Sequence, residues 1–189
     1  MQRTLYQSIL GDAFAQLPEE IRYMHTYARE ATGTANVRRG TSWAARLIGS
    51  LAALPDTATD VPVRTSFAPL ENGERWTRRF AEDPFQTDMI AGTEEPYPCM
   101  RERLGPFLFK MRVSVRPDGL DLDPESIHLG PLRLPGFLAP KAYGRERVVD
   151  GKYSFSVKVI FPLIGTVLEY EGRLTPSITV SDAPPPQRD

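Results

Sequence analysis

The N-terminal part of the chain has apolar residues at the spacing of an amphipathic helix. They recur close to every third or fourth position from Leu5 to Leu17, and Pro18 ends this run. Proline is nevertheless favoured in the first turn of a helix, so a second helix is expected to run from Pro18 past Met24. The sequence therefore predicts two short helices at the start of the chain.

A third helix is predicted after residues 31–40, a stretch with two Gly and two Thr that could itself be a first strand. Thr41 or Ser42 is a suitable N-cap, because a side-chain oxygen can accept a hydrogen bond from the first turn. The apolar residues that follow share one helical stripe: Trp43, Leu47, Leu51 and Leu54. Such a stripe is expected to pack on the core. Trp43 is interpreted as a plug of that core.

From about residue 61 the apolar period changes from 3.6 to 2, which is typical of strands with one buried face. Asn72-Gly73 is a strong hairpin signal. The clearest alternation gives two apolar faces. One consists of Phe107, Phe109, Met111, Val113 and Val115, and the other of Tyr153, Phe155, Val157, Val159 and Phe161. These segments are predicted to be antiparallel strands, because no helices are interleaved between them.

The pattern as a whole predicts an α+β fold in a single domain, residues 1–178. N-terminal helices (about residues 4–54) pack on a curved antiparallel β-sheet or β-barrel of about eight strands (about residues 61–175). Residues 129–141 contain three prolines and two glycines, which favours a crossing loop or short helix at a barrel rim. Residues 179–189, with three consecutive prolines, are expected to form a disordered tail.

Composition and charge narrow the classes of function. The chain has 189 residues, of which 41% are hydrophobic, enough for a core that needs no disulfide or metal. Lys and Arg number 23 against 24 Asp and Glu, so no basic field spans the domain. A nucleic-acid partner is therefore not expected.

Cysteine and hydropathy bear on the compartment. Cys99 is the single cysteine, so no intrachain disulfide can form. The N-terminus lacks the apolar core of a signal peptide. The longest uncharged apolar stretch, residues 160–168, is far shorter than the roughly 20 residues that cross a bilayer. We expect a cytoplasmic protein without a transmembrane segment.

Several chemistries are excluded by the residues present. Two histidines and one cysteine cannot supply the four N or S ligands of a structural zinc site. No nucleophile elbow, phosphate loop or dinucleotide fingerprint occurs. We therefore expect neither a metal nor a cofactor. His25, on a short helix, is interpreted as structural or exposed rather than catalytic.

Arg78 lies between Trp76 and Phe80 on a strand face that is expected to be mostly buried. A buried Arg needs a carboxylate or a ligand anion, because an unpaired buried charge is costly. Two interpretations remain open: an Arg that binds an anion or head group in a cavity, and a cross-strand Arg–Glu pair. The candidate partners for such a pair are Glu74, Glu102 and Glu146.

The leading hypothesis is a non-enzymatic domain that binds a lipid-like or other hydrophobic small molecule on the concave aromatic face of the sheet. The candidate ligand-binding residues are Trp76, Arg78, Glu102, Phe109, Met111, Glu146, Phe155 and Tyr170. The alternative is an enzyme in which Arg78, Glu102 and Glu146 line the cavity and carry out proton transfer.

Five segments resemble an uncharacterised bacterial family, catalogued as domain of unknown function 4166. They are residues 5–25, 73–80, 101–111, 134–157 and 162–174, so the resemblance covers about residues 5–174. Family members stand alone or follow a saccharopine-dehydrogenase-like oxidoreductase domain. The resemblance implies no activity, cofactor or catalytic residue. The fusion implies a third hypothesis: an accessory module, near redox or lipid metabolism, that docks a separate oxidoreductase through a sheet edge or the 129–141 loop.

Overall fold

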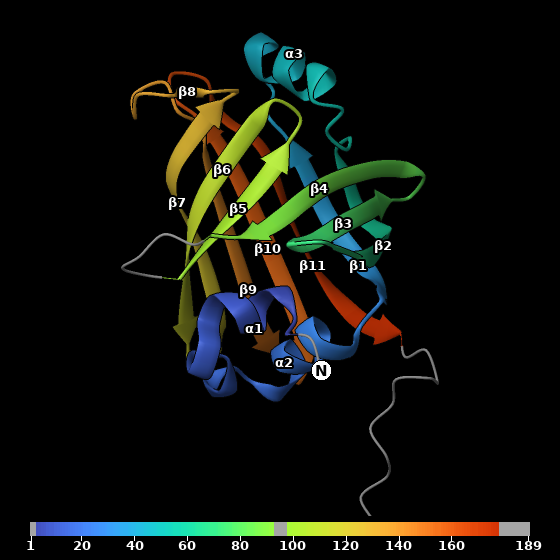
Figure 1. Ribbon diagram of the computed structural model, residues 1–189. Helices are drawn as coiled ribbons and strands as arrows, with labels where there is room; N and C mark the ends of the chain where they lie inside the picture. The colour runs from blue at the N-terminus through green and yellow to red at the C-terminus, as the bar shows by residue number, and fades with distance from the viewer. Residues whose placement is uncertain (1–2, 93–97, 178–189) are drawn as a thin grey trace, which may run out of the picture.

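A computed structural model describes residues 3–92 and 98–177, which fold into a closed antiparallel β-barrel (Figure 1). Its strands are β1 (Glu30–Arg39), β2 (Ala58–Leu70), β3 (Gly73–Phe80), β4 (Asp83–Ala91), β5 (Cys99–Leu104), β6 (Phe107–Arg116), β7 (Gly119–Leu129), β8 (Leu132–Arg133), β9 (Lys141–Val149), β10 (Lys152–Phe161) and β11 (Gly165–Ser177). Around the barrel the order is β6-β5-β4-β3-β2-β1-β11-β10-β9-β7, and pairing of β7 with β6 closes the ring. The short β8 pairs with β7 outside it.

The helices lie at the two ends of the barrel (Figure 1). They are α1 (Leu5–Leu10), the 3-10 helix η1 (Gly11–Gln16), α2 (Glu19–Tyr27) and α3 (Trp43–Leu51). α1 and α2 cover one end, and α3 lies at the other. The predicted cap of the third helix is confirmed, since Ser42 Oγ accepts a hydrogen bond from the Ala45 N–H at 3.2 Å.

The fold is predominantly β, with ten barrel strands and one extra strand among the described residues, where about eight strands were predicted. β1 lies within the predicted helical part, where residues 31–40 were given as a possible first strand. Its inward positions include Ala31, Gly33 and Ala35, so it lacks the large apolar residues that reveal a strand in a sequence. At Gly33 an added Cβ would lie 1.8 Å from the Arg173 carbonyl oxygen of β11. Close packing of β1 against β11 therefore requires small residues there.

The predicted hairpins and alternation agree with the structure. β2 and β3 are joined by a turn at residues 71–72, with Gly73 as the first paired residue of β3. On β6, Phe109, Met111 and Val113 are buried on the inner face. Residues 129–141 connect β7 to β9 at the barrel rim, with β8 inside the loop. The predicted tail, residues 179–189, lies outside the described residues.

The prediction that Trp43 plugs the core is wrong. Trp43 is 80% exposed, and Leu47 and Leu51 are exposed with it. α3 instead packs on the barrel through Ala45 and Gly49, which are buried. At Gly49 an added Cβ would lie 2.2 Å from the Arg39 guanidinium, so a larger residue there would have to displace that side chain.

Candidate functional site: a cavity inside the barrel

The interior of the barrel contains a cavity of about 510 Å³. It runs from Tyr6 of α1 at one end to Ile48 and Leu51 of α3 and the β5–β6 turn at Gly105 and Pro106 at the other. Most of its lining is apolar. Small-molecule sites in proteins commonly have volumes of about 300–1,000 Å³ and mainly apolar walls with a few polar groups. The cavity has the size and the lining of such a site.

All eight residues that the sequence singled out line this cavity. They are Trp76, Arg78, Glu102, Phe109, Met111, Glu146, Phe155 and Tyr170, and they come from six different strands. Phe155, Val157 and Val159 point inward but remain partly exposed, because they face the hollow rather than other side chains. Sequence reasoning missed Tyr6 and Thr87, which line the same cavity, as does Tyr153 of the predicted apolar face.

A buried polar cluster at the α1–α2 end of the cavity is centred on Glu146, which is 5% exposed. Tyr6 donates its hydroxyl hydrogen to Glu146 Oε1 at 3.2 Å, and His25 Nε2 lies 2.6 Å from Glu146 Oε2. The Tyr6 and His25 rings stack with their centroids 3.7 Å apart. Glu146 therefore fastens α1 and α2 to the barrel wall, with His25 as the contact from α2.

The tyrosines around Glu146 are held in their protonated form. Burial raises the pKa of Tyr6 well above its ordinary value, and the negative charge of Glu146 adds to the shift. Burial and the Glu146 charge likewise raise the pKa of Tyr153 well above normal, and a hydrogen bond to Glu146 contributes further. Both hydroxyls thus remain donors towards the carboxylate across the physiological pH range.

Glu74, one of the candidate partners of Arg78, is engaged elsewhere. Trp76 Nε1 donates to Glu74 Oε2 at 3.1 Å, and the Leu5 backbone N–H donates to Glu74 Oε1 at 3.3 Å. The carboxylate thereby links the indole in the cavity wall to the start of α1. It does not form the predicted cross-strand pair with Arg78.

Arg78 is buried, with 8% of its surface exposed, and lines the cavity. Its Nη1 donates to Thr87 Oγ1 at 3.1 Å, and its guanidinium carbon lies 4.9 Å from the centroid of the Trp76 ring. Within the described part of the chain, no carboxylate lies within 4 Å of it to form an ion pair. A guanidinium has five N–H donors. Arg78 therefore has donors left for a group inside the cavity.

The Tyr170 hydroxyl is influenced by the charges of both Arg78 and Glu102. Burial raises the pKa of the Tyr170 hydroxyl, the positive charge of Arg78 opposes the shift, and the negative charge of Glu102 adds to it. The Tyr170 ring packs edge-on against Phe80 and Phe155, at 5.3 and 6.0 Å between centroids. Arg78, Glu102 and Tyr170 thus form a polar group in the wall of a largely apolar cavity.

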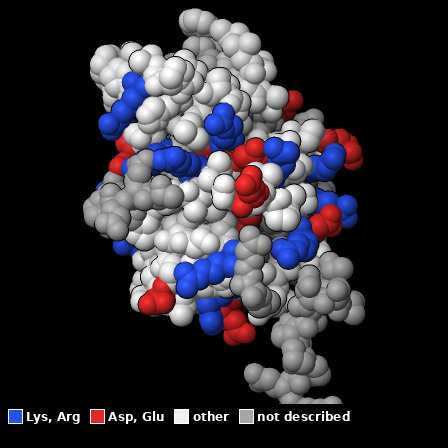
Figure 2. Space-filling model, viewed as in Figure 1, with Lys and Arg blue, Asp and Glu red and all other residues white. Residues whose placement is uncertain are grey.

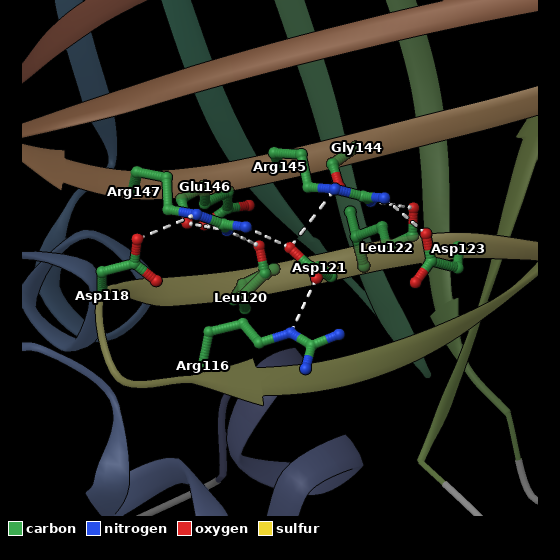
Figure 3. Close-up of polar contacts among 10 residues, drawn as sticks. All are labelled: Arg116, Asp118, Leu120, Asp121, Leu122, Asp123, Gly144, Arg145, Glu146 and Arg147. Carbon is green, nitrogen blue, oxygen red and sulfur yellow. Dashed lines mark hydrogen bonds and ion pairs between the residues drawn. The ribbon is translucent and has the colours of Figure 1, made fainter.

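Arg145 and Arg147 flank Glu146 in sequence but lie on the outer face of the barrel (Figure 3). Together with Arg116 they surround Asp121 of β7. Burial would raise the pKa of Asp121, but hydrogen bonds from Arg147 and Arg116 outweigh it and lower the pKa. The two β9 arginines also donate to backbone carbonyls of β7. This cluster fastens the seam where β7 and β9 share only four residue pairs.

Two further features concern metals and membranes. Among residues 3–92 and 98–177, no three His, Cys, Asp or Glu side chains gather in a way that could hold a metal ion. No helix in the same residues is long and apolar enough to cross a membrane.

Comparison with known proteins identifies a family but no function. No curated protein and no solved structure matches the chain. The family described as a domain of unknown function, DUF4166, matches residues 17–174, which run from the end of η1 through α2, α3 and all but the last residues of the barrel. The chain therefore belongs to the DUF4166 family.

Proposed function

We propose that the protein binds a lipid-like or other hydrophobic small molecule inside the barrel. The observation that carries this proposal is the cavity of about 510 Å³ with mainly apolar walls. An empty apolar cavity of this size forgoes contacts on all sides, which costs stability. A ligand with an apolar body would restore those contacts.

The polar residues of the wall determine which ligands fit. Arg78 has unused donors, and Tyr170 has a protonated hydroxyl close by. A carboxylate or another acceptor group at one end of the ligand would satisfy Arg78, whose burial without an ion pair is otherwise costly. An amphipathic molecule with one acceptor head group and an apolar tail therefore fits better than a pure hydrocarbon.

The first test is native mass spectrometry of protein purified without detergent, followed by organic extraction and identification of released compounds. A stoichiometric apolar compound supports the proposal and names its class. A second test is the binding of alkyl carboxylates of increasing length to folded protein from which bound compounds have been removed. Each added methylene should tighten Kd by up to about fourfold until the cavity is full. Affinity that does not depend on chain length would contradict burial of the tail.

Arg78→Met tests the head group separately. This variant should weaken binding of alkyl carboxylates about tenfold or more, since a hydrogen bond to a charged group contributes about 1.5–3 kcal/mol. Binding of the corresponding alkanes should change little. Thr87→Val, which removes only the present partner of Arg78, is the matched control. Equal effects of Arg78→Met on both ligand series would contradict a head-group role.

A second candidate function is an enzyme. The observation that favours it is the buried contact of His25, which lies outside the cavity lining, with Glu146, which belongs to it. A carboxylate and an imidazole in contact can exchange a proton with a substrate. The discriminating variants are Glu102→Gln and Glu146→Gln. In an enzyme they would abolish turnover of a bound compound and barely change its binding. In a carrier they would leave the bound compound chemically unchanged, as in the wild type.

A further inference from the structure

The barrel end that carries α3 exposes large apolar side chains. Trp43, Leu47 and Leu51 follow one another at helical spacing on the outer side of α3, while Ala45 and Gly49 face the barrel. In an ordinary surface helix the apolar stripe faces the core. Here the stripe is turned outward.

Other segments add to this apolar surface at the same end of the molecule. Of the nine large apolar side chains exposed in the described part of the chain, eight lie there: Trp43, Leu47, Leu51, Leu129, Leu132, Phe137, Leu138 and Leu163. Figure 2 shows that this end, at the top, is mostly free of Lys, Arg, Asp and Glu on the face in view. We call these eight side chains the apolar rim. Exposed apolar patches of this kind mark interaction surfaces.

Leu163 is the rim residue whose exposure is hardest to explain by folding alone. It lies in the β10–β11 turn, is 100% exposed and has a φ of 63°. The left-handed backbone conformation costs a non-glycine residue roughly 1–2 kcal/mol, and no buried contact of the side chain offsets it. A polar residue or glycine would suit this turn better for folding alone.

Positive charges stand among the apolar side chains. Arg46 of α3, Arg133 of β8 and Lys141 at the start of β9 are exposed, and none forms an ion pair with another described residue. The carboxylate of Asp56, which follows α3, is already paired with Arg39. Leucine and tryptophan side chains next to unpaired cations are the composition that binds the interface of an anionic bilayer.

The apolar rim also borders the cavity. Leu51 belongs to both, and Ile48 and Ala53 beside it line the cavity together with Gly105 and Pro106 of the β5–β6 turn. We propose that the α3 end docks on the surface of a bilayer containing anionic lipids, with the apolar rim inserted among the head groups, so that a lipid-like ligand passes directly between bilayer and barrel. The passage of ligand rests on the proposed function, whereas the docking does not.

Vesicle flotation tests the docking. The protein is mixed with vesicles of phosphatidylcholine alone or of equal parts phosphatidylcholine and phosphatidylglycerol. We expect binding to the anionic vesicles, and the double variant Leu47→Ser, Leu51→Ser should reduce it at least about tenfold. The control is Val149→Ser, which removes an exposed apolar side chain at the opposite end and should not change binding. Circular dichroism checks that all variants fold.

Substitution of the exposed arginines and the fluorescence of Trp43 test the docking independently. Arg46→Ser and Arg133→Ser should each weaken binding to anionic vesicles about fivefold and leave binding to phosphatidylcholine vesicles unchanged, and added salt should mimic them. Trp43 fluorescence should shift to shorter wavelength on addition of anionic vesicles, because the indole leaves water. Trp43→Phe should remove that shift, since Trp76 is already buried.

Three results would overturn the docking. One is wild-type protein that does not bind anionic vesicles. Another is unchanged binding by the Leu47→Ser, Leu51→Ser variant. The third is light scattering that shows a wild-type dimer which this variant dissociates, since a second copy of the chain would then cover the rim. Uptake of an apolar fluorescent probe without vesicles separates the two proposals: probe uptake without vesicle binding refutes docking alone, and vesicle binding without probe uptake refutes the ligand site alone.

Discussion

The substitution Ala142→Leu tests whether the barrel is hollow. Ala142 lies on β9, is buried and lines the cavity. Leucine adds three carbon atoms, and each carbon that moves from water into a dry hollow contributes about 0.8 kcal/mol, or about 2.4 kcal/mol in total. Ordering the leucine side chain costs about 0.5–1 kcal/mol. The variant should therefore raise the free energy of unfolding of the ligand-free protein by about 1.5 kcal/mol.

The matched control is Ala31→Leu. Ala31 is fully buried on β1 between β2 and β11 and is not part of the cavity lining. The same three carbon atoms must there displace packed neighbours, which costs about 1–3 kcal/mol. The two variants thus make the same chemical change, and the structure predicts opposite signs for them.

Urea denaturation and calorimetry of lipid-extracted protein measure the free energy of unfolding and the Tm of the two variants. For a chain of this size, 1 kcal/mol shifts Tm by about 2–4 °C, so the Tm of Ala142→Leu should exceed that of Ala31→Leu by at least about 5 °C. Ala142→Leu should also shorten the longest alkyl carboxylate that still binds. Equal destabilisation by both substitutions would mean that the barrel is packed at residue 142, and the ligand proposal would lose its basis.

Three further predictions concern the clusters around the cavity. Asp121→Ala should lower the free energy of unfolding by about 3 kcal/mol near pH 7, because three guanidinium groups lose their shared carboxylate. Since the folded-state pKa of Asp121 is lowered, this difference should be present above about pH 4 and shrink as the pH falls, which urea titrations at several pH values would show. The raised pKa of Tyr153 makes the free energy of unfolding depend on pH in the alkaline range. The stability that Tyr153 contributes is present below about pH 10 and is lost above it. Tyr153→Phe should therefore flatten the alkaline loss of stability in the same titrations. Leu163→Gly should raise the free energy of unfolding by about 0.5 kcal/mol in urea denaturation, because glycine accepts the positive φ, and should weaken vesicle binding at the same time.

The sequence predicted the inner face of the barrel well because strand geometry leaves little choice. Side chains two apart on a strand share a face, so alternation alone aligned Phe109 with Met111 and placed Trp76 and Arg78 on the same side. Once the barrel closes, every inward face borders the same interior. This is why residues chosen from six strands line one cavity.

The features that the sequence did not predict depend on contacts that no local pattern encodes. Tyr6 and Glu146 are 140 positions apart, and their hydrogen bond exists only because α1 covers one end of the barrel. The segment of β1 gave only a possible first strand, because its inward residues are small. Trp43 was misplaced because an apolar stripe does not reveal whether it faces a core or another partner.

The two ends of the barrel differ in what must break for a ligand to enter. At the α1–α2 end, opening would separate Glu146 from Tyr6 and His25, and Glu74 from the Leu5 backbone. Each hydrogen bond to a charged group contributes about 1.5–3 kcal/mol, so this end should stay closed. At the α3 end, the buried residues of the helix are the small Ala45 and Gly49, Ile48 is partly buried, and the exposed Leu51 already reaches the cavity lining. The free-energy cost of access is therefore lower beside α3, where the apolar rim lies.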